Sequence, residues 1–368
     1  MRILRLLDTT NRGGSEIQAL DICRNAARFG LEYTLVAAGG GALNGQFSSS
    51  GVEFIRLQRH LPIDLLLVAQ LRRIIIKRSI QIVHGHQAVE SIHLYLASLG
   101  LNDVRHVLNF DGFVPDGKNR RTLKYLIPRM DANVAVGHAL RKWLAEKDGL
   151  DTKTNFHVIH TGPDPMRLVP SAEPRPEQLG IEKDEILLGM VGSFYRDPRK
   201  DQLTICRALP KVFAAFPKAH CIFSGGVEKG AEHKIAACRT FCDDHGISPR
   251  VHFLGADSSV PDILAALDLF VFSSLHEGMP LAVSEAMLAG VPLIVSDIEP
   301  LLEATEKGTY AEVFPTGDAE ILAEKIISLL GDDERRKQLA EKTRVYANEN
   351  LSIDAHLGNL KKLYESIV

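Results

Sequence analysis

Two glutamates eight positions apart, Glu277 and Glu285, stand in the segment whose residue types could carry the most chemistry. Apolar runs rich in β-branched and aromatic residues lie before and after it, at 269–272 and 291–295. This pattern predicts a strand, a loop, a helix and a second strand. Glu277 would lie in the loop and Glu285 about one turn inside the helix, so both carboxylates can point beyond the carboxyl end of the first strand.

The expected helix supplies a second kind of binding group. Proline fits the first helical position because its fixed φ and missing N–H cost nothing there, so Pro280 should begin the helix and Gly290 should cap its end. The backbone amides of Gly278 and Met279 would be free to bind an anion at the helix N-terminus. A carboxylate, in turn, accepts hydrogen bonds from paired sugar hydroxyls, as in dinucleotide sites. The residues expected to bind a nucleotide here are Glu277, Gly278, Met279, Pro280, Leu281 and Glu285.

The segment 274–290 resembles the E-x7-E signature of retaining, nucleotide-sugar-dependent glycosyltransferases of family 4. The resemblance implies the GT-B fold, an α/β architecture with two doubly wound, Rossmann-like parallel-sheet domains facing a central cleft. It also implies that Glu277 contacts the transferred sugar and that Glu285 binds the ribose of the nucleotide. The alternative interpretation is a strand–helix unit with two solvated glutamates, because surface glutamates are common.

A glycine pair near the N-terminus is a second candidate for ligand contact. Gly13 and Gly14 lie between an apolar strand and an amphipathic helix, where glycines let the backbone approach an anion. The absence of a G-x-G-x-x-G fingerprint here argues against a dehydrogenase. Residues 13–16 resemble the family's G-G-x-E loop, whose amides face the donor diphosphate and the acceptor; a plain tight turn is the alternative. We interpret the glycines at 39–41 as a flexible loop, with no helix starting close behind them.

Cations follow the first strand of the second half. Arg196, Arg199 and Lys200 could neutralise a pyrophosphate, and an arginine adds a forked contact. The resemblance assigns the diphosphate to an arginine and a lysine in this loop. Lys200 matches the lysine, whereas Ser193 replaces the arginine, so either other arginine would supply that charge. A solvated basic turn is the alternative.

Polar residues also end strands of the first half. The family usually has a histidine beside the donor sugar where this chain has Asp111, which could bind an acceptor hydroxyl or take its proton. A shifted alignment would instead give that place to His106 or to no residue. His84 and His86 are too few for a metal site, and we expect a structural or binding role for them. In the second half, the resemblance implies that the main chain at His252 contacts the nucleotide base.

Apolar strand candidates alternate with helical patterns along the chain, which predicts two doubly wound parallel sheets. A proline cluster after residue 163 reads as a linker. The expected organisation is an N-terminal acceptor-side domain at 1–165, a linker at 166–184, a nucleotide-sugar domain at 185–350, and a final helix at 351–368 that crosses back to the first domain. The strands expected in the first half are 2–7, 33–37, 52–57, 81–84, 104–109, 132–136 and 156–159.

Composition limits the class of protein. The chain has 368 residues, enough for two ordinary domains, with 45% hydrophobic and 24% charged residues. A formal net charge of −3 gives no electrostatic reason to expect nucleic acid binding. Five cysteines without a C-x-x-C pair are expected to be thiols of a reducing cytosol. No apolar run is long enough to span a bilayer, so we expect a cytoplasmic location.

One segment bears on membrane contact. Residues 63–76 and the two that follow mix leucine and isoleucine with Arg72, Arg73, Lys77 and Arg78. Such a helix could lie on a membrane surface, which would suit a lipid-linked acceptor. The alternative, which we favour, is a crossover helix packed on the sheet with an arginine-rich outer face.

The expected reaction follows from the resemblance and from the cations. No D-x-D motif occurs in the chain, so the departing diphosphate would be stabilised by Lys200, arginines and backbone amides, without a metal or other cofactor. We expect retaining transfer of a hexose from a nucleoside-diphosphate sugar, with UDP-glucose or a UDP-N-acetylhexosamine as the first guess, to a glycan or lipid-linked glycan in surface polysaccharide synthesis. The catalytic candidates are Glu277, Lys200 and Asp111. Two alternatives stay open, a UDP-sugar 2-epimerase and a non-catalytic sugar-nucleotide binder.

Overall fold

The computed structural model describes residues 1–114, 116–171, 180–182, 184–256 and 259–368. The chain divides into two compact units, of which the first comprises Met1–Pro163 together with Ile353–Val368 and the second comprises Asp164–Ser352. The expected linker at 166–184 falls partly on residues 172–179 and 183, which lie outside the described residues.

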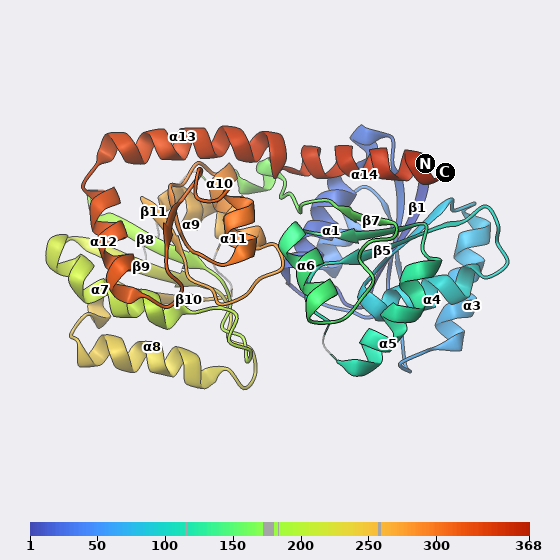
Figure 1. Ribbon diagram of the computed structural model, residues 1–368, viewed down its shortest axis with the longest axis horizontal. Helices are drawn as coiled ribbons and strands as arrows, with labels where there is room; N and C mark the ends of the chain where they lie inside the picture. Colours follow the sequence, from blue (N-terminus) through green and yellow to red (C-terminus); the bar gives the residue numbers. More distant parts are fainter. Residues whose placement is uncertain (115, 172–179, 183, 257–258) are drawn as a thin grey trace. The chain divides into compact units, whose positions relative to one another are not determined.

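The first unit is built on a seven-stranded sheet with the order β3-β2-β1-β4-β5-β6-β7, in which all strand pairs are parallel (Figure 1). All seven expected strands form, each within two residues of its expected bounds. The strands are β1 (Arg2–Leu7), β2 (Glu32–Ala37), β3 (Glu53–Arg56), β4 (Ile82–His86), β5 (Arg105–Phe110), β6 (Ala132–Ala135) and β7 (Phe156–Val158).

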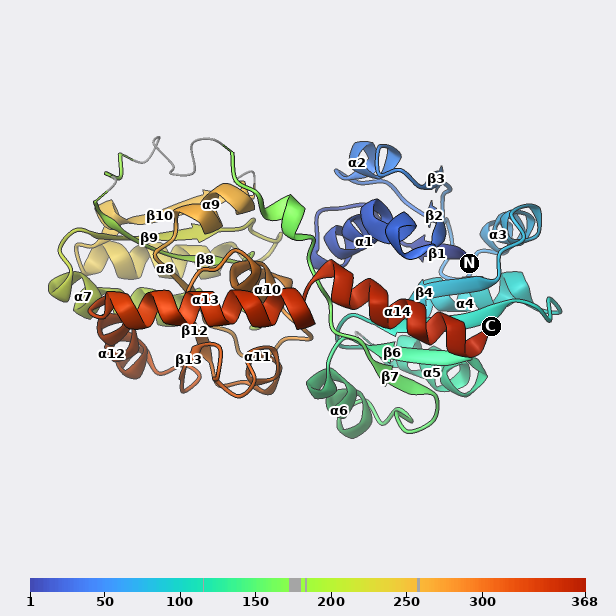
Figure 2. The same ribbon diagram turned by 90° about the horizontal axis from the view of Figure 1, so that it is seen from above.

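Helices cover both faces of this sheet because its strands carry apolar residues on both faces. On one face, α1 (Gly14–Asn25) and α14 (Ile353–Ile367) pack on Ile3 and Ile82. On the other face, α3 (Leu65–Lys77) and α4 (Gln87–Ser98) pack on Leu4 and Val83. Figure 2 shows α14 lying along the strands of the first unit. The remaining helices of the unit are α2 (Asn44–Ser48), α5 (Gly117–Leu126) and α6 (His138–Glu146).

The second unit contains a six-stranded parallel sheet with the order β10-β9-β8-β11-β12-β13. Its strands are β8 (Ile186–Val191), β9 (Ala219–Ser224), β10 (Val251–Gly255), β11 (Leu269–Phe272), β12 (Leu293–Ser296) and β13 (Glu312–Phe314). Its helices are α7 (Gln202–Ala215), α8 (Glu232–Asp244), α9 (Val260–Ala266), α10 (Leu281–Leu288), α11 (Glu299–Ala304), α12 (Ala319–Leu330) and α13 (Asp333–Asn350). Two Rossmann-like parallel sheets are therefore present, as expected.

Three expectations about local structure need correction. A short helix, α2, begins at Asn44, three positions after the last of the glycines that we interpreted as a flexible loop. Gly41 there packs on the backbone of Thr10, which a Cβ atom would approach to 2.2 Å. Strand β13 was not predicted, because three residues are too few to show a strand periodicity. Helix α10 begins at Leu281, one residue later than expected, with Pro280 as its N-cap.

Among the described residues, no helix combines the length and apolar character that crossing a bilayer requires.

Candidate functional site

Two loops at the carboxyl edge of the second sheet are joined by main-chain hydrogen bonds. The loop after β8 ends at Lys200, and the loop after β11 starts at Ser273. The N–H of Leu275 donates to the carbonyl of Arg199 at 2.8 Å, and the N–H of Asp201 donates to the carbonyl of Ser273 at 3.1 Å. These strands are neighbours in the sheet, so their carboxyl ends bring the basic loop and the glutamate loop together.

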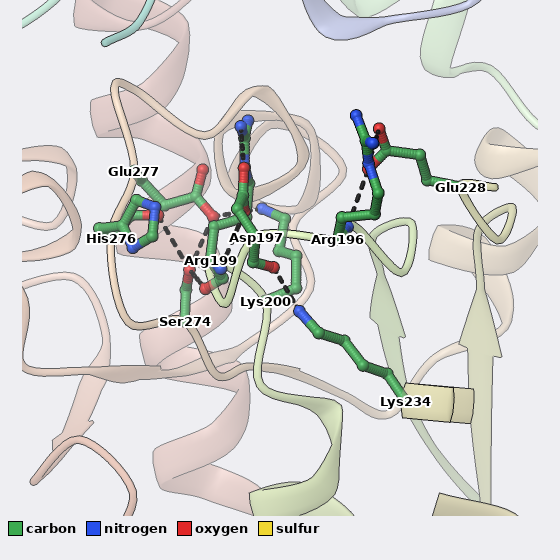
Figure 3. Close-up of polar contacts among 9 residues, drawn as sticks. All are labelled: Arg196, Asp197, Arg199, Lys200, Glu228, Lys234, Ser274, His276 and Glu277. Atoms are coloured by element: carbon green, nitrogen blue, oxygen red, sulfur yellow. Dashed lines mark hydrogen bonds and ion pairs between the residues drawn. The ribbon is translucent and has the colours of Figure 1, made fainter. Parts of the chain in front are cut away.

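The joined loops place Lys200 against Glu277. The Lys200 Nζ lies 2.5 Å from Glu277 Oε1, and about a tenth of each side chain is exposed. Ser274 Oγ donates to the same carboxylate oxygen at 2.7 Å, and the ammonium also lies over the ring of Phe272. Figure 3 shows the side chains of Lys200, Ser274 and Glu277 pointing toward one another. The interpretation of Glu277 as a solvated glutamate is therefore wrong.

The environment of this ion pair changes the acidity of the lysine. Burial lowers the pKa of Lys200, although the neighbouring Glu277 carboxylate opposes that effect. A buried ion pair adds little to stability by itself, because removing two charges from water costs about as much as their attraction returns. An ammonium and a carboxylate fixed side by side can bind a phosphate oxygen and a sugar hydroxyl, respectively.

The two candidate arginines of the basic loop differ in their surroundings. Arg196 has an exposed side chain and pairs with Glu228 at 3.3 Å, apart from the lysine (Figure 3). Arg199 pairs with Asp197 at 2.5 Å and holds the pKa of that carboxyl at about 2, chiefly through its hydrogen bonds. The positive charge of Arg199 also lowers the pKa of Lys200. Another cation that the sequence did not single out, Lys234, donates to the carbonyl of Asp197.

Helix α10 presents backbone donors beside Glu277. Pro280, the N-cap residue, has a φ of −74°, and Gly290 beyond the helix end has a φ of +72°, as expected for a glycine cap. Neither Gly278 nor Met279 donates a backbone hydrogen bond to any residue that the structure describes. These amides and the helix dipole can therefore meet an anion.

Glu285 lies within α10 and is buried. Its Oε1 is 2.7 Å from Arg167 Nη2, and Arg167 is also mostly buried. Arg167 belongs to the short 3₁₀ helix Pro165–Leu168, whose N-cap Asp164 accepts from the N–H of Met166. Arg167 was not predicted as a site residue, because it lies among prolines that are typical of a linker. The sequence shows only a positive charge between two prolines, and its contact with Glu285 is visible in the tertiary structure.

The expected base-binding position lies on an edge strand. His252 is in β10, which pairs with β9 on one side and ends the sheet on the other. The imidazole of His252 stacks on His220 and is hydrogen-bonded to it at 3.1 Å. The imidazole of His252 is thus occupied by its contact with His220. The backbone of an edge strand, by contrast, has N–H and C=O groups that can bind a ligand.

In the first unit, the glycine pair stands at the N-terminus of α1. Gly13 is the N-cap residue and Gly14 is the first residue of the helix. A Cβ atom on Gly14 would meet nothing within 4 Å, so internal packing does not require a glycine there. An open glycine at a helix N-terminus is compatible with the close approach of a ligand.

Asp111 follows β5 and is held by neighbouring side chains. His86 Nδ1 hydrogen-bonds to Asp111 Oδ2, and Asn109 donates to Oδ1 at 2.5 Å. Burial alone would raise the pKa of Asp111, but the contact with His86 and the charge of Arg5 outweigh burial and lower it. His106 lies near the amino end of β5, where it contacts Ser98. It therefore lies at the opposite end of β5 from Asp111.

The two strand-end histidines have different surroundings. His84 is fully buried, and its Nδ1 lies 2.6 Å from the hydroxyl of Tyr364 in α14, so its role is structural. His86 contacts Asp111 and belongs to the candidate site. No group of histidine, cysteine or acidic residues in the described parts of the chain is arranged to hold a metal ion. All five cysteines are free and buried.

Comparison with known proteins gives one group of relatives. N-acetyl-alpha-D-glucosaminyl L-malate synthase of Bacillus anthracis is 22% identical over 97% of this chain and 94% of its own length. The N,N'-diacetylbacillosaminyl-diphospho-undecaprenol alpha-1,3-N-acetylgalactosaminyltransferase of Campylobacter jejuni is 36% identical over 41% of this chain and 38% of its own length. Among solved structures, Anabaena HepE in complex with UDP and glucose matches with a TM-score of 0.84 and 20% identity, covering 100% of both chains.

Sequence profiles of two families match successive parts of the chain. Residues 12–167 match the profile described as Glycosyltransferase Family 4, and residues 171–346 match the one described as Glycosyl transferases group 1. The matched ranges together span most of the chain and correspond to its two parallel-sheet units. The chain therefore belongs to glycosyltransferase family 4 and is a glycosyltransferase with the GT-B fold.

Proposed function

We propose that the protein transfers a hexose, with retention at the anomeric carbon, from a UDP-sugar to a hydroxyl group of a glycan or lipid-linked glycan. The observation that carries this proposal is the Lys200–Glu277 pair beside the open start of α10. An ammonium group binds a phosphate, and a carboxylate beside it accepts a hydrogen bond from a sugar hydroxyl. Retention is supported by the resemblance of the E-x7-E segment.

In the proposed reaction, the bond between the anomeric carbon and the diphosphate oxygen breaks, and a bond from that carbon to the acceptor oxygen forms. The nucleoside diphosphate leaves with the bonding electrons, and the acceptor hydroxyl gives its proton to an oxygen of that departing diphosphate. Lys200, Arg199 and the amides of Gly278 and Met279 would stabilise the charge on the leaving diphosphate. Glu277 would bind a hydroxyl of the transferred sugar, and Glu285 would bind the ribose.

UDP is the proposed nucleotide, with glucose or an N-acetylhexosamine as the sugar. The structure of HepE was solved with UDP and glucose, which supports UDP as the nucleotide. The Campylobacter relative is named for transfer to an undecaprenol-linked sugar, which supports a lipid-linked acceptor. The edge strand at His252 offers main-chain groups to the base. Because fixed cations and amides can take over the charge stabilisation that a metal often supplies, we propose that transfer is independent of metal.

A peripheral membrane contact through α3 is part of the proposal. Its inner residues Leu67, Leu71 and Ile75 are buried on the sheet. Its outer face is more apolar than the arginine-rich surface that we favoured, because Leu65 is 73% exposed and Ile76 is 58% exposed. Leu66 is also exposed on this face, as are the cations Arg73 and Lys77, and the exposed residues Leu61 and Ile63 come just before the helix. Apolar residues beside exposed cations fit an anionic lipid surface.

A donor panel tests the function. Binding and slow hydrolysis of UDP-, GDP- and ADP-sugars would be measured in EDTA for the native chain, Glu285→Ala and Lys200→Ala. We expect one UDP-sugar to bind and to release UDP, and both substitutions to abolish the release. With an acceptor, proton NMR of the product would show the α-linkage of a retained centre. Isomerisation of the donor without an acceptor would instead indicate an epimerase, and binding without release a non-catalytic binder.

A further inference from the structure

A buried arginine in the first unit has an unusual partner. Arg5 in β1 is 2% exposed, and its Nε donates to His86 Nε2 at 2.7 Å. Strand alternation places Arg5 and His86 on the same face of the sheet as Ile3, under α1 and α14. A guanidinium can only donate hydrogen bonds, so His86 Nε2 must accept with its lone pair.

This contact determines the proton position on His86. Since Nε2 accepts from Arg5, the ring proton must be on Nδ1, which faces Asp111 Oδ2. His86 therefore donates to the carboxylate, and Asn109 donates to its other oxygen at 2.5 Å. Each oxygen of Asp111 keeps a lone pair, and about a sixth of the side chain is exposed to solvent, at 17%.

The residue after His86 holds the same loop. Gln87 has a φ of +50°, in the left-handed region that residues other than glycine seldom adopt, and its side chain donates to the carbonyl of Gly112 at 3.0 Å. Two adjacent side chains from the end of β4 thus contact two adjacent residues after β5. The position and the orientation of Asp111 are fixed before any substrate arrives.

We infer that Asp111 is a pre-oriented hydrogen-bond acceptor for a sugar hydroxyl, and that Arg5 and His86 are positioning residues that keep its carboxylate ionised. This inference rests on the proposed transferase function and narrows the two roles that the sequence left open for Asp111. A carboxylate that already accepts two hydrogen bonds is a weak base, so binding a hydroxyl suits it better than abstracting its proton.

The proton on His86 can be tested without substrate. In the full chain labelled with ¹⁵N-histidine, the His86 signal is identified by its loss in His86→Asn. We expect a protonated Nδ1 and an unprotonated Nε2 at neutral pH. A proton on Nε2, alone or together with one on Nδ1, would overturn the positioning role of Arg5.

Two substitutions of His86 separate positioning from packing. An asparagine amide nitrogen is as many bonds from the backbone as histidine Nδ1, and a glutamine amide nitrogen as many as Nε2. We expect UDP-glucose hydrolysis to fall about tenfold or more in His86→Gln and distinctly less in His86→Asn, because only asparagine retains a donor toward Asp111. Equal losses in both variants, in step with their thermal midpoints, would mean that His86 only packs.

The pH profile gives an independent readout. Without the His86 donor, the pKa of Asp111 should rise, so the acid limb of UDP-glucose hydrolysis should move to higher pH in His86→Gln and not in His86→Asn. An unmoved limb in both would contradict the inference. The other ionisable groups that act on Asp111, which the two variants share, are Arg5 from β1, Glu16 from α1, Glu90 from α4 and His356 from α14.

Asp111→Asn distinguishes the inference from the function beneath it. We expect this variant to bind UDP like the native chain and to hydrolyse UDP-glucose at least about tenfold more slowly. If the native chain hydrolyses UDP-glucose and Asp111→Asn does so equally well, only the inference fails. If the native chain neither binds UDP nor hydrolyses UDP-glucose, the proposed donor fails, and the role of Asp111 fails with it.

Discussion

Arg167 and Glu285 form a buried ion pair, with Nη2 and Oε1 2.7 Å apart, although 118 positions separate them in the chain. Arg167 comes from the first turn of the second unit and Glu285 from the interior of α10. The arginine holds a carboxylate that the E-x7-E resemblance assigns to the nucleotide ribose. The proposed ribose ligand is thus held by the segment in which the second unit begins.

Replacement of Arg167 should weaken nucleotide binding. In Arg167→Met, the buried Glu285 carboxylate loses the guanidinium that lies 2.7 Å from its Oε1, so the proposed ribose acceptor is held less firmly. We expect UDP affinity, measured by calorimetry, to fall about tenfold, or ~1.4 kcal/mol. Arg207→Met, at an exposed position of α7, is the control and should bind UDP normally. Equal UDP affinity in the two variants would show that Arg167 does not contribute to nucleotide binding.

Replacement of Lys200 should affect turnover more than folding. Lys200→Met retains the bulk of the side chain and removes the charge from beside Glu277. We expect the rate of UDP-glucose hydrolysis to fall by about a hundredfold or more, as when one fixed donor to a developing anion is lost. Lys211→Met, at a surface lysine that pairs with Glu320, controls for the loss of an ion pair. Native-like turnover in Lys200→Met would exclude Lys200 from the reaction.

Two glycines should respond oppositely to alanine. Gly14→Ala should fold normally, because its Cβ meets open space, but it should lower UDP-glucose hydrolysis if a ligand approaches the N-terminus of α1. Gly41→Ala should lower the thermal midpoint, because its Cβ would lie 2.2 Å from the backbone of Thr10. Circular dichroism melts and donor hydrolysis on both variants check the pair. Full activity in Gly14→Ala would show that this glycine serves only the turn.

Polar substitution on α3 should release the protein from lipid. The double change Leu65→Gln and Leu66→Gln removes two residues that are 73% and 61% exposed, without touching the buried face of the helix. We expect co-sedimentation with anionic liposomes to fall, and native binding to weaken with salt because Arg73 and Lys77 contribute. Val345→Gln, at a 49% exposed position of α13, is the control. Absence of native binding to these liposomes would exclude the membrane contact.

Glu90 should make the first unit less stable at alkaline pH. Burial raises the pKa of Glu90 to about 8 from an ordinary 4.5, so the folded chain binds this proton more tightly than the unfolded chain. The contribution of Glu90 to the free energy of unfolding therefore falls as pH rises from 4.5 to about 8. Glu90→Gln keeps an acceptor for the N–H of Asp8 but cannot ionise.

Urea unfolding at two pH values measures this effect. Each unit of pKa shift corresponds to about 1.4 kcal/mol, so Glu90→Gln should exceed the native chain by a few kcal/mol at pH about 9 and by little at pH about 5. If the difference in free energy of unfolding between the two proteins does not change with pH, the pKa of Glu90 is not raised by burial.

Much of the fold was predictable, because local periodicity determined it. All seven strands of the first sheet and the final helix follow from apolar patterns, since each element must bury one face. Strand β13 and helix α2 were missed because both are too short to display a period. The glutamate loop and Lys200 were located from residue types at strand ends, since parallel strands bring their carboxyl ends to one edge.

The sequence by itself determined the family, the two parallel sheets and the residues that could bind a sugar nucleotide. The tertiary structure decided which charges meet: Lys200 with Glu277, Arg167 with Glu285, and His86 with Asp111. It also separated Arg199 from Arg196, which a count of positive charges treats alike. The physical reason is that periodicity acts over a few residues, whereas an ion pair depends on a few ångströms between segments far apart in the chain.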